Sequence, residues 1–155
     1  MNEEFLRIYN LYKNDILRLS YSITKRMNDA EDITQNVFIK YYKCKNNFLN
    51  DNQIKHWLIK VTINESKDLF KSFWRKNFMN NNNELDNVST TEKEYLEIKE
   101  ALFKLTNKQR IIIYLFYYEG YKVKEISDIL KINSSTIQTI LNRTRKELKD
   151  LLGGN

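Results

Sequence analysis

The absence of proline is the feature that most limits how this chain can fold. None of the 155 residues is proline and only three are glycine, so there are few positions at which a helix must stop. Apolar residues recur at steps of three and four, the spacing that places them along one face of a helix. Both observations predict an all-α protein.

The periodic pattern predicts three helices in the first half of the chain. One covers residues 5–23, and a second begins at a cap formed by Asn28 or Asp29. A third covers about residues 54–76, after a polar break at residues 46–53. The residues expected to face the core are Phe5, Ile8, Tyr9, Tyr12, Ile16, Leu19, Ile23, Ile33, Val37, Phe38, Tyr41, Trp57, Leu58, Val61, Leu69 and Phe73.

Residues 77–94 differ in composition from the segments on either side. They are rich in asparagine and acidic residues and poor in apolar ones, which is typical of a flexible linker. Basic residues exceed acidic ones by five in residues 1–76 and again in residues 98–155. We therefore expect two small basic helical domains, residues 1–76 and 95–155, joined by a flexible acidic linker.

Two further helices are predicted directly after the linker. The first is short and amphipathic, and it ends near Leu105. The second begins at a cap formed by Thr106 and buries Ile112 and Leu115. It is expected to end at Gly120, because glycine readily adopts the left-handed conformation that stops a helix.

Residues 120–147, GYKVKEISDILKINSSTIQTILNRTRKE, predict two helices around the tight turn KIN, a helix-turn-helix. Ser134 or Ser135 is the expected cap of the second helix. Its outer face carries short polar side chains suited to base edges, followed by cations suited to phosphates. These residues are Ser135, Thr136, Gln138, Thr139, Asn142, Arg143, Arg145 and Lys146. An ordinary helical hairpin with a solvated basic face would show the same pattern.

Charge and composition restrict the class of function. The net charge of +6 and the pI of about 9.2 favour an anionic partner, most often nucleic acid. No apolar run reaches the roughly 20 residues of a membrane span. Cys44 is the only cysteine, which fits a reducing cytoplasm, and His56 is the only histidine, without a partner spaced for zinc. We expect no enzyme activity, cofactor or metal.

The stretch DAEDITQNVFIKYYK, residues 29–43, has three carboxylates at its start and admits three interpretations. As a metal site it would need ligands converging from elsewhere, because the carboxylates point around one helical turn. As a helix start it is stabilised by the positive end of the helix dipole. The third interpretation is a docking surface.

Residues 105–152 resemble the −35-binding domain of bacterial RNA polymerase sigma factors. The matching marks are Gln109-Arg110, Glu119-Gly120, Glu125-Ile126, Thr136-Ile137 and Arg143-x-Arg145-Lys146. DAEDITQNVFIKYYK followed by HWLIKVTINESKDLF is similar to the other conserved sigma domain. Two such domains in this order look like the extracytoplasmic-function (ECF) type.

The resemblance implies a role for each part of the chain. Residues 1–76 would bind core polymerase and recognise and melt the −10 element, and residues 95–155 would recognise the −35 element through the outer face of the second helix of the helix-turn-helix. The residues implied in docking on the polymerase clamp are Asp29, Asp32, Gln35 and Asn36. Those implied in −10 binding are Asn47, Asn50, Asp51, Asn52, Trp57, Lys60, Asn64, Lys67, Lys71, Trp74, Arg75 and Lys76.

The implied partners are core RNA polymerase at its clamp and flap regions, promoter DNA as duplex and as melted non-template strand, and an anti-sigma factor. Ile63, Gln138, Ile140 and Lys131 depart from the family pattern, so the promoter sequence cannot be transferred. Two other interpretations stay open: a stand-alone helix-turn-helix regulator that uses only the C-terminal domain, and a protein-interaction module.

Overall fold

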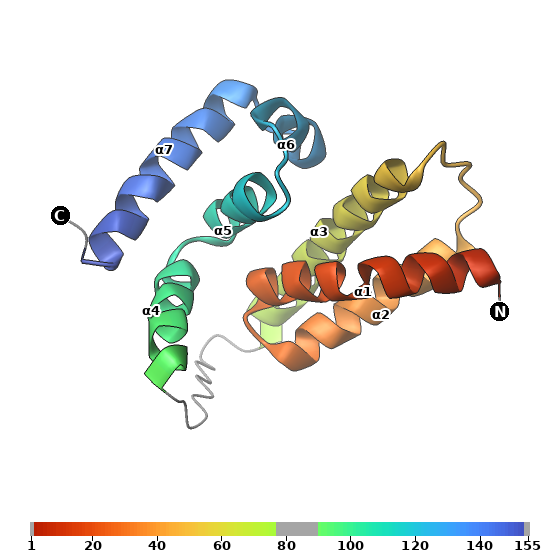
Figure 1. Cartoon of the computed structure of the whole chain (residues 1–155), viewed down its shortest axis with the longest axis horizontal. Coiled ribbons are helices and arrows are strands. Elements are labelled where there is room, and N and C mark those ends of the chain that lie inside the picture. The colour runs from red at the N-terminus through yellow and green to blue at the C-terminus, as the bar shows by residue number, and fades with distance from the viewer. Residues whose placement is uncertain (1, 77–89, 154–155) are drawn as a thin grey trace. The chain divides into compact units, whose positions relative to one another are not determined.

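The computed structural model describes the backbone of residues 2–76 and 90–153 and the side chains of residues 2–69 and 96–153. All the regular structure in these ranges is helical, which confirms the predicted all-α class (Figure 1). The chain divides into two compact units, residues 1–76 and 77–155. Within the described ranges, no helix is both long enough and apolar enough to cross a membrane.

The first unit consists of three helices that all pack on one another: α1 Glu3–Thr24, α2 Met27–Lys43 and α3 Asp51–Lys76. Its core is made of the apolar residues Ile8, Tyr12, Ile16, Leu19, Ile23, Ala30, Ile33, Val37, Phe38, Ile54, Leu58, Ile59 and Ile63. Ile54, Ile59 and Ile63 were not predicted to be buried. Phe5, Tyr41, Trp57, Val61 and Leu69 are only half-buried and Tyr9 is exposed, whereas the side chain of Phe73 lies outside the described ranges.

The corner between α1 and α2 differs from the predicted one. The helix α2 begins at Met27, and neither Asn28 nor Asp29 is its cap. Lys25 adopts the left-handed conformation with φ 63°, and the Thr24 hydroxyl donates to the carbonyl oxygen of Arg26 over 3.1 Å. Because this corner closes so tightly, the chain resumes helical geometry before it reaches Asn28, and Asp29 lies in the first turn of α2.

The second unit contains α4 Thr90–Lys104, α5 Asn107–Ile113, a wider π-type turn η1 Tyr114–Tyr118, α6 Val123–Leu130 and α7 Ser134–Leu151. Its core contains Ala101, Leu105, Ile111, Ile112, Ile113, Leu115, Ile126, Ile129, Ile137 and Leu141. The helix α4 begins before the predicted end of the linker at residue 94, and residues 77–89 of that linker lie outside the described part of the chain.

The start of α5 follows the prediction. The Thr106 hydroxyl accepts from the backbone N–H of Gln109 over 3.2 Å, and the Gln109 side chain accepts from the backbone N–H of Thr106 over 2.9 Å. This capping box satisfies two backbone donors that a helix start otherwise leaves open. The left-handed Gly120, with φ 74°, was also predicted correctly. The π-type turn before it was not predicted.

The turn between α6 and α7 is made by Lys131, Ile132 and Asn133. Lys131 is left-handed with φ 56°, and the backbone N–H of Ile132 donates to the carbonyl oxygen of Ser127 over 3.2 Å. The prediction that Ser134 or Ser135 caps α7 was wrong, because the helix already begins at Ser134. Asn133 occupies the cap position and makes no side-chain capping bond.

Arg110 is 3% exposed, and its burial was not predicted. Its guanidinium donates to the carbonyl oxygen of Leu105 and to the side-chain oxygen of Asn107, and it lies over the ring of Phe103. Burial lowers the pKa of Arg110 to about 10, so the group stays charged at neutral pH. Arg110 therefore joins the end of α4 to the start of α5 through carbonyl and amide acceptors.

We predict that Thr106→Ala lowers the free energy of unfolding of the second unit by about 1 kcal/mol, because the cap of α5 is lost. Native-state hydrogen exchange of the buried amides of α7 measures this unit separately from the first. Ser134→Ala is the matched control, since Ser134 makes no capping bond and should cost close to nothing. Equal losses for the two variants would contradict this assignment of the caps.

Candidate functional site

The exposed face of α7 is the most regular polar surface of the second unit. Ile137 and Leu141 are fully buried on the opposite side of the helix, and Thr144 is buried with them. This arrangement fixes the rotation of the helix about its axis. All the residues predicted for the outer face are exposed, namely Ser135, Thr136, Gln138, Thr139, Asn142, Arg143, Arg145 and Lys146.

Side chains of α5 and η1 hold α7 in place. The Gln109 side chain of α5 donates to the Glu147 carboxylate over 3.1 Å. The Arg145 guanidinium donates to the Tyr117 hydroxyl and lies 5.5 Å from the centre of the Phe116 ring. It also donates to the side-chain oxygen of Asn142 over 3.0 Å. Arg145 thus helps to pack α7 against η1. Sequence reasoning missed this role because Tyr117 and Phe116 lie on a different helical segment.

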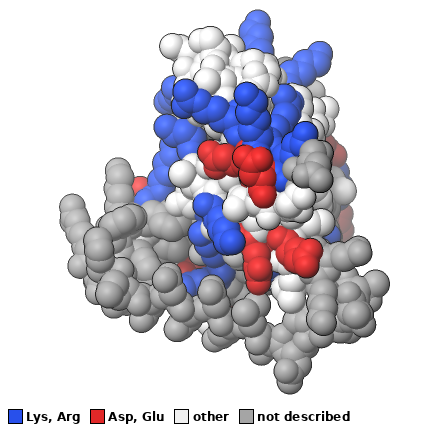
Figure 2. All heavy atoms as spheres, turned by 90° about the vertical axis from the view of Figure 1, so that its left-hand side faces the viewer, with Lys and Arg blue, Asp and Glu red and all other residues white. Residues whose placement is uncertain are grey.

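Many Lys and Arg side chains are visible on the face shown in Figure 2. Lys and Arg side chains cover much of its upper part, with small groups of Asp and Glu among and below them. Such a surface is complementary to the phosphates of a nucleic acid, and the attraction weakens as the salt concentration rises.

The helix α2 carries an exposed polar surface. Asp32, Gln35 and Asn36 are exposed and Asp29 is half-buried, whereas Phe38 on the other side is 2% exposed. Residues three and four apart share one face of a helix, so Asp32, Gln35 and Asn36 form one polar surface. Among the residues that the structure describes, no group of three or more His, Cys, Asp or Glu could hold a metal ion.

The chain between α2 and α3 is held by side-chain bonds. Asn50 accepts from the backbone N–H of Gln53 over 3.0 Å, and Gln53 accepts from the backbone N–H of Leu49 over 2.9 Å. Both carboxylate oxygens of Asp51 accept from Arg7, over 2.9 and 2.8 Å. The side-chain oxygen of Asn50 and the carboxylate of Asp51 therefore already have hydrogen-bond partners within the protein. The neighbouring residues Asn47 and Asn52 are exposed.

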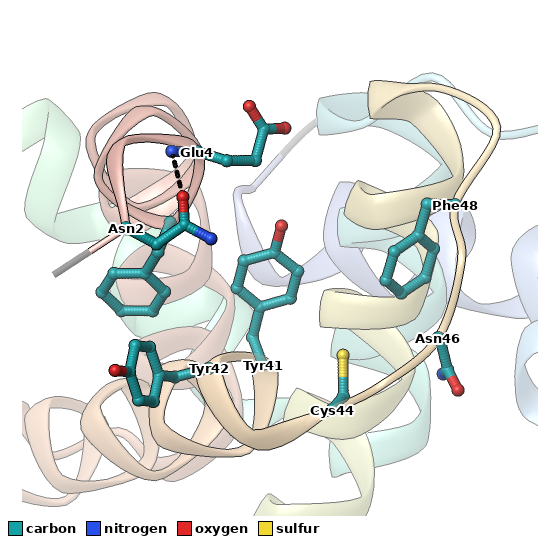
Figure 3. A pocket seen from close by; sticks show the side chains of 8 residues that line it. Asn2, Glu4, Tyr41, Tyr42, Cys44, Asn46 and Phe48 are labelled. Atoms are coloured by element: carbon teal, nitrogen blue, oxygen red, sulfur yellow. Dashed lines mark hydrogen bonds between the residues drawn. The ribbon is translucent and has the colours of Figure 1, made fainter.

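A pocket of about 150 Å³, which we call the aromatic pocket, opens beside this loop (Figure 3). It is lined by Asn2, Glu4, Phe5, Tyr41, Tyr42, Cys44, Asn46 and Phe48. The rings of Phe5 and Tyr42 meet edge to face with centres 5.2 Å apart, and Phe48 lies 6.1 Å from Trp57. Burial raises the pKa of the Tyr41 hydroxyl, which keeps it neutral. Sequence reasoning missed the aromatic lining of this pocket because periodicity assigned Phe5 and Tyr41 to the core.

The predicted −10 residues of α3 have different surroundings. Asn64 and Lys67 are exposed, whereas Trp57 and Lys60 are half-buried. The remaining four lie where the structure describes no side chains: Lys71, Trp74, Arg75 and Lys76. Ile63 is 3% exposed and therefore belongs to the core of the first unit.

Comparison with known families gives one match for each unit. Residues 8–76 match sigma-70 region 2, and residues 95–148 match sigma-70 region 4. The chain is 28% identical over 151 residues to the ECF RNA polymerase sigma factor SigM of Bacillus subtilis, covering 93% of this chain and 92% of the relative. It is 25% identical over 162 residues to SigX of the same species, covering 96% and 84%.

Solved structures show the same fold. The sigma factor RpoE of Bartonella quintana, in complex with the anti-sigma factor NepR, matches with a TM-score of 0.73 at 19% identity, covering 98% of both chains. CnrH, in complex with the cytosolic domain of CnrY, matches with a TM-score of 0.71 at 19% identity, covering 98% of this chain and 90% of that one. The chain belongs to the sigma-70 family of RNA polymerase sigma factors, as a non-enzymatic member of the ECF type that directs promoter recognition by RNA polymerase.

Proposed function

We propose that the two units recognise different promoter elements, the second unit the −35 element and the first the −10 element. The observation that carries this proposal is the division of α7 into a side buried through Ile137 and Leu141 and an exposed polar side. A helix held in this way can enter the major groove without disturbing the core behind it. The two units act together because a linker raises the effective concentration of each at its site.

In the second unit, Gln138 and Thr136 lie near the start of α7 and contact base edges. Amide side chains recognise adenine through paired hydrogen bonds, and hydroxyls contact several bases. Arg143 and Lys146 lie further along the helix and bind phosphates. Arg145 contributes mainly by holding α7 against η1, because Tyr117 and Asn142 already accept its N–H groups.

In the first unit, the aromatic pocket accepts a base flipped out of the melted non-template strand. Aromatic faces stack on bases, and the amides of Asn46 and Asn47 supply donors and acceptors for a base edge. Asn52, Asn64, Lys60 and Lys67 extend this surface along α3. The proposal also includes Lys71, Trp74, Arg75 and Lys76, whose side chains lie outside the described ranges.

Core polymerase binds the polar surface of α2, with Asp32 and Gln35 at its centre and the clamp as the expected partner. The flap of the polymerase is the expected partner of the second unit. Because RpoE and CnrH were solved with an anti-sigma factor and a cytosolic partner domain, we include an anti-sigma factor among the partners of this chain. The protein acts in the cytoplasm, where polymerase and promoter are found.

The double substitution Asp32→Ala/Gln35→Ala should weaken binding to core polymerase at least about tenfold, because truncating central interface residues costs more than 1 kcal/mol each. Binding is measured by co-elution and titration with sigma-free core enzyme. Asp68→Ala is the control, since it removes an exposed carboxylate from another helix of the same unit. If the double variant binds as tightly as the control, α2 is not the docking surface.

Substitutions on α7 should separate sequence recognition from phosphate binding. Gln138→Ala should relax the preference for one base pair by about 1–3 kcal/mol. Arg143→Ala should weaken binding of all duplexes and lower the salt slope by about 1, with Lys149→Ala as a control of equal charge. Both are measured with the holoenzyme on a −35 duplex library at several salt concentrations. An unchanged base preference in Gln138→Ala would show that α7 is oriented differently in the groove.

A further inference from the structure

An ion pair joins the start of α1 to the start of α3. Arg7 donates two nearly parallel hydrogen bonds to the Asp51 carboxylate, 2.9 and 2.8 Å long, across 44 residues of sequence. Such a paired geometry fixes the direction of both side chains as well as their distance. Arg7 lies just outside the segment that matches region 2, which starts at residue 8.

Arg7 also binds the first turn of its own helix. It donates to the Glu4 carboxylate over 2.8 and 3.1 Å. Hydrogen bonds from Arg7 lower the pKa of both Asp51 and Glu4, so both carboxylates are charged at neutral pH. One guanidinium thus connects the first turn of α1 with the first residue of α3.

The first turn of α1 and the loop before α3 form opposite sides of the aromatic pocket. Glu4, together with Asn2, lies on one side, and Asn46 and Phe48 of the loop before α3 lie on the other (Figure 3). Asp51 directly follows the loop. The Arg7–Asp51 pair therefore ties the end of this loop to α1.

We propose that Arg7 is a positioning residue for base recognition in the −10 element, acting by holding Asp51 and so fixing the loop that lines the pocket. This inference rests on the proposed role of the pocket. The side chains of Arg7 and Asp51 are 47% and 43% exposed, and ion pairs with this exposure contribute little to stability. The effect of losing the pair therefore falls on recognition and leaves folding nearly unchanged.

The test uses the holoenzyme and a pool of single-stranded non-template oligonucleotides randomised over the −10 segment. The wild-type holoenzyme selects its preferred oligonucleotide, and affinity is then measured for that oligonucleotide and a scrambled one. Arg7→Gln and Asp51→Asn should each lower the preference for the selected sequence about tenfold, the scale of one lost charge-assisted contact. The control Arg18→Gln removes an exposed arginine from the same helix and should keep the preference.

Further measurements separate positioning from other roles. Thermal unfolding should be nearly unchanged in Arg7→Gln, and the charge exchange Arg7→Asp/Asp51→Arg should recover part of the preference. The salt slope of binding should stay at the wild-type value, whereas loss of a direct phosphate contact would lower it by about 1 and overturn the positioning role.

Two outcomes distinguish this inference from the proposed function. If the wild-type holoenzyme selects a sequence and Arg7→Gln retains the preference shown by Arg18→Gln, Arg7 has no positioning role and the −10 assignment stands. If the wild-type holoenzyme prefers no oligonucleotide over the scrambled one, the proposed −10 role of the first unit fails, and the inference fails with it.

Discussion

Burial of one apolar face per helix, in two separate small cores, is the constraint on which the rest of the structure depends. Burying an isoleucine or leucine side chain contributes about 1.5–3 kcal/mol, and nine such side chains are buried in the described part of each unit. In units of this size, every helix must bury its apolar side in the core. The packing of the core therefore fixes the rotation of each helix about its axis. Side chains that bind partners lie on the opposite faces.

This constraint explains why the candidate sites are polar surfaces on rigid helices. Ile137 and Leu141 orient α7 so that its hydroxyls, amides and cations face outward together. Val37 and Phe38 do the same for the carboxylate and amide side chains of α2. The pocket beside α3 is the exception, because it lies where the helices end and a loop connects them. Ring contacts such as Phe5–Tyr42 line this pocket, and side-chain hydrogen bonds hold the loop beside it.

Local sequence signals predicted much of the fold and part of the site. The cap at Thr106 and the left-handed Gly120 follow from chemistry within a few residues, and the outer face of α7 follows from its period. Interactions between distant residues could not be predicted in this way. The Arg7–Asp51 pair joins residues 44 positions apart, and the periodicity of either helix gives no sign of it.

The most direct test of the central claim is to map transcription starts on a library of genomic fragments from the source organism, with core polymerase alone and with this protein added. We expect new, discrete starts that depend on the protein and share two upstream sequence elements at a fixed separation. Starts that are the same with and without the protein, or that share no upstream sequence, would contradict the central claim.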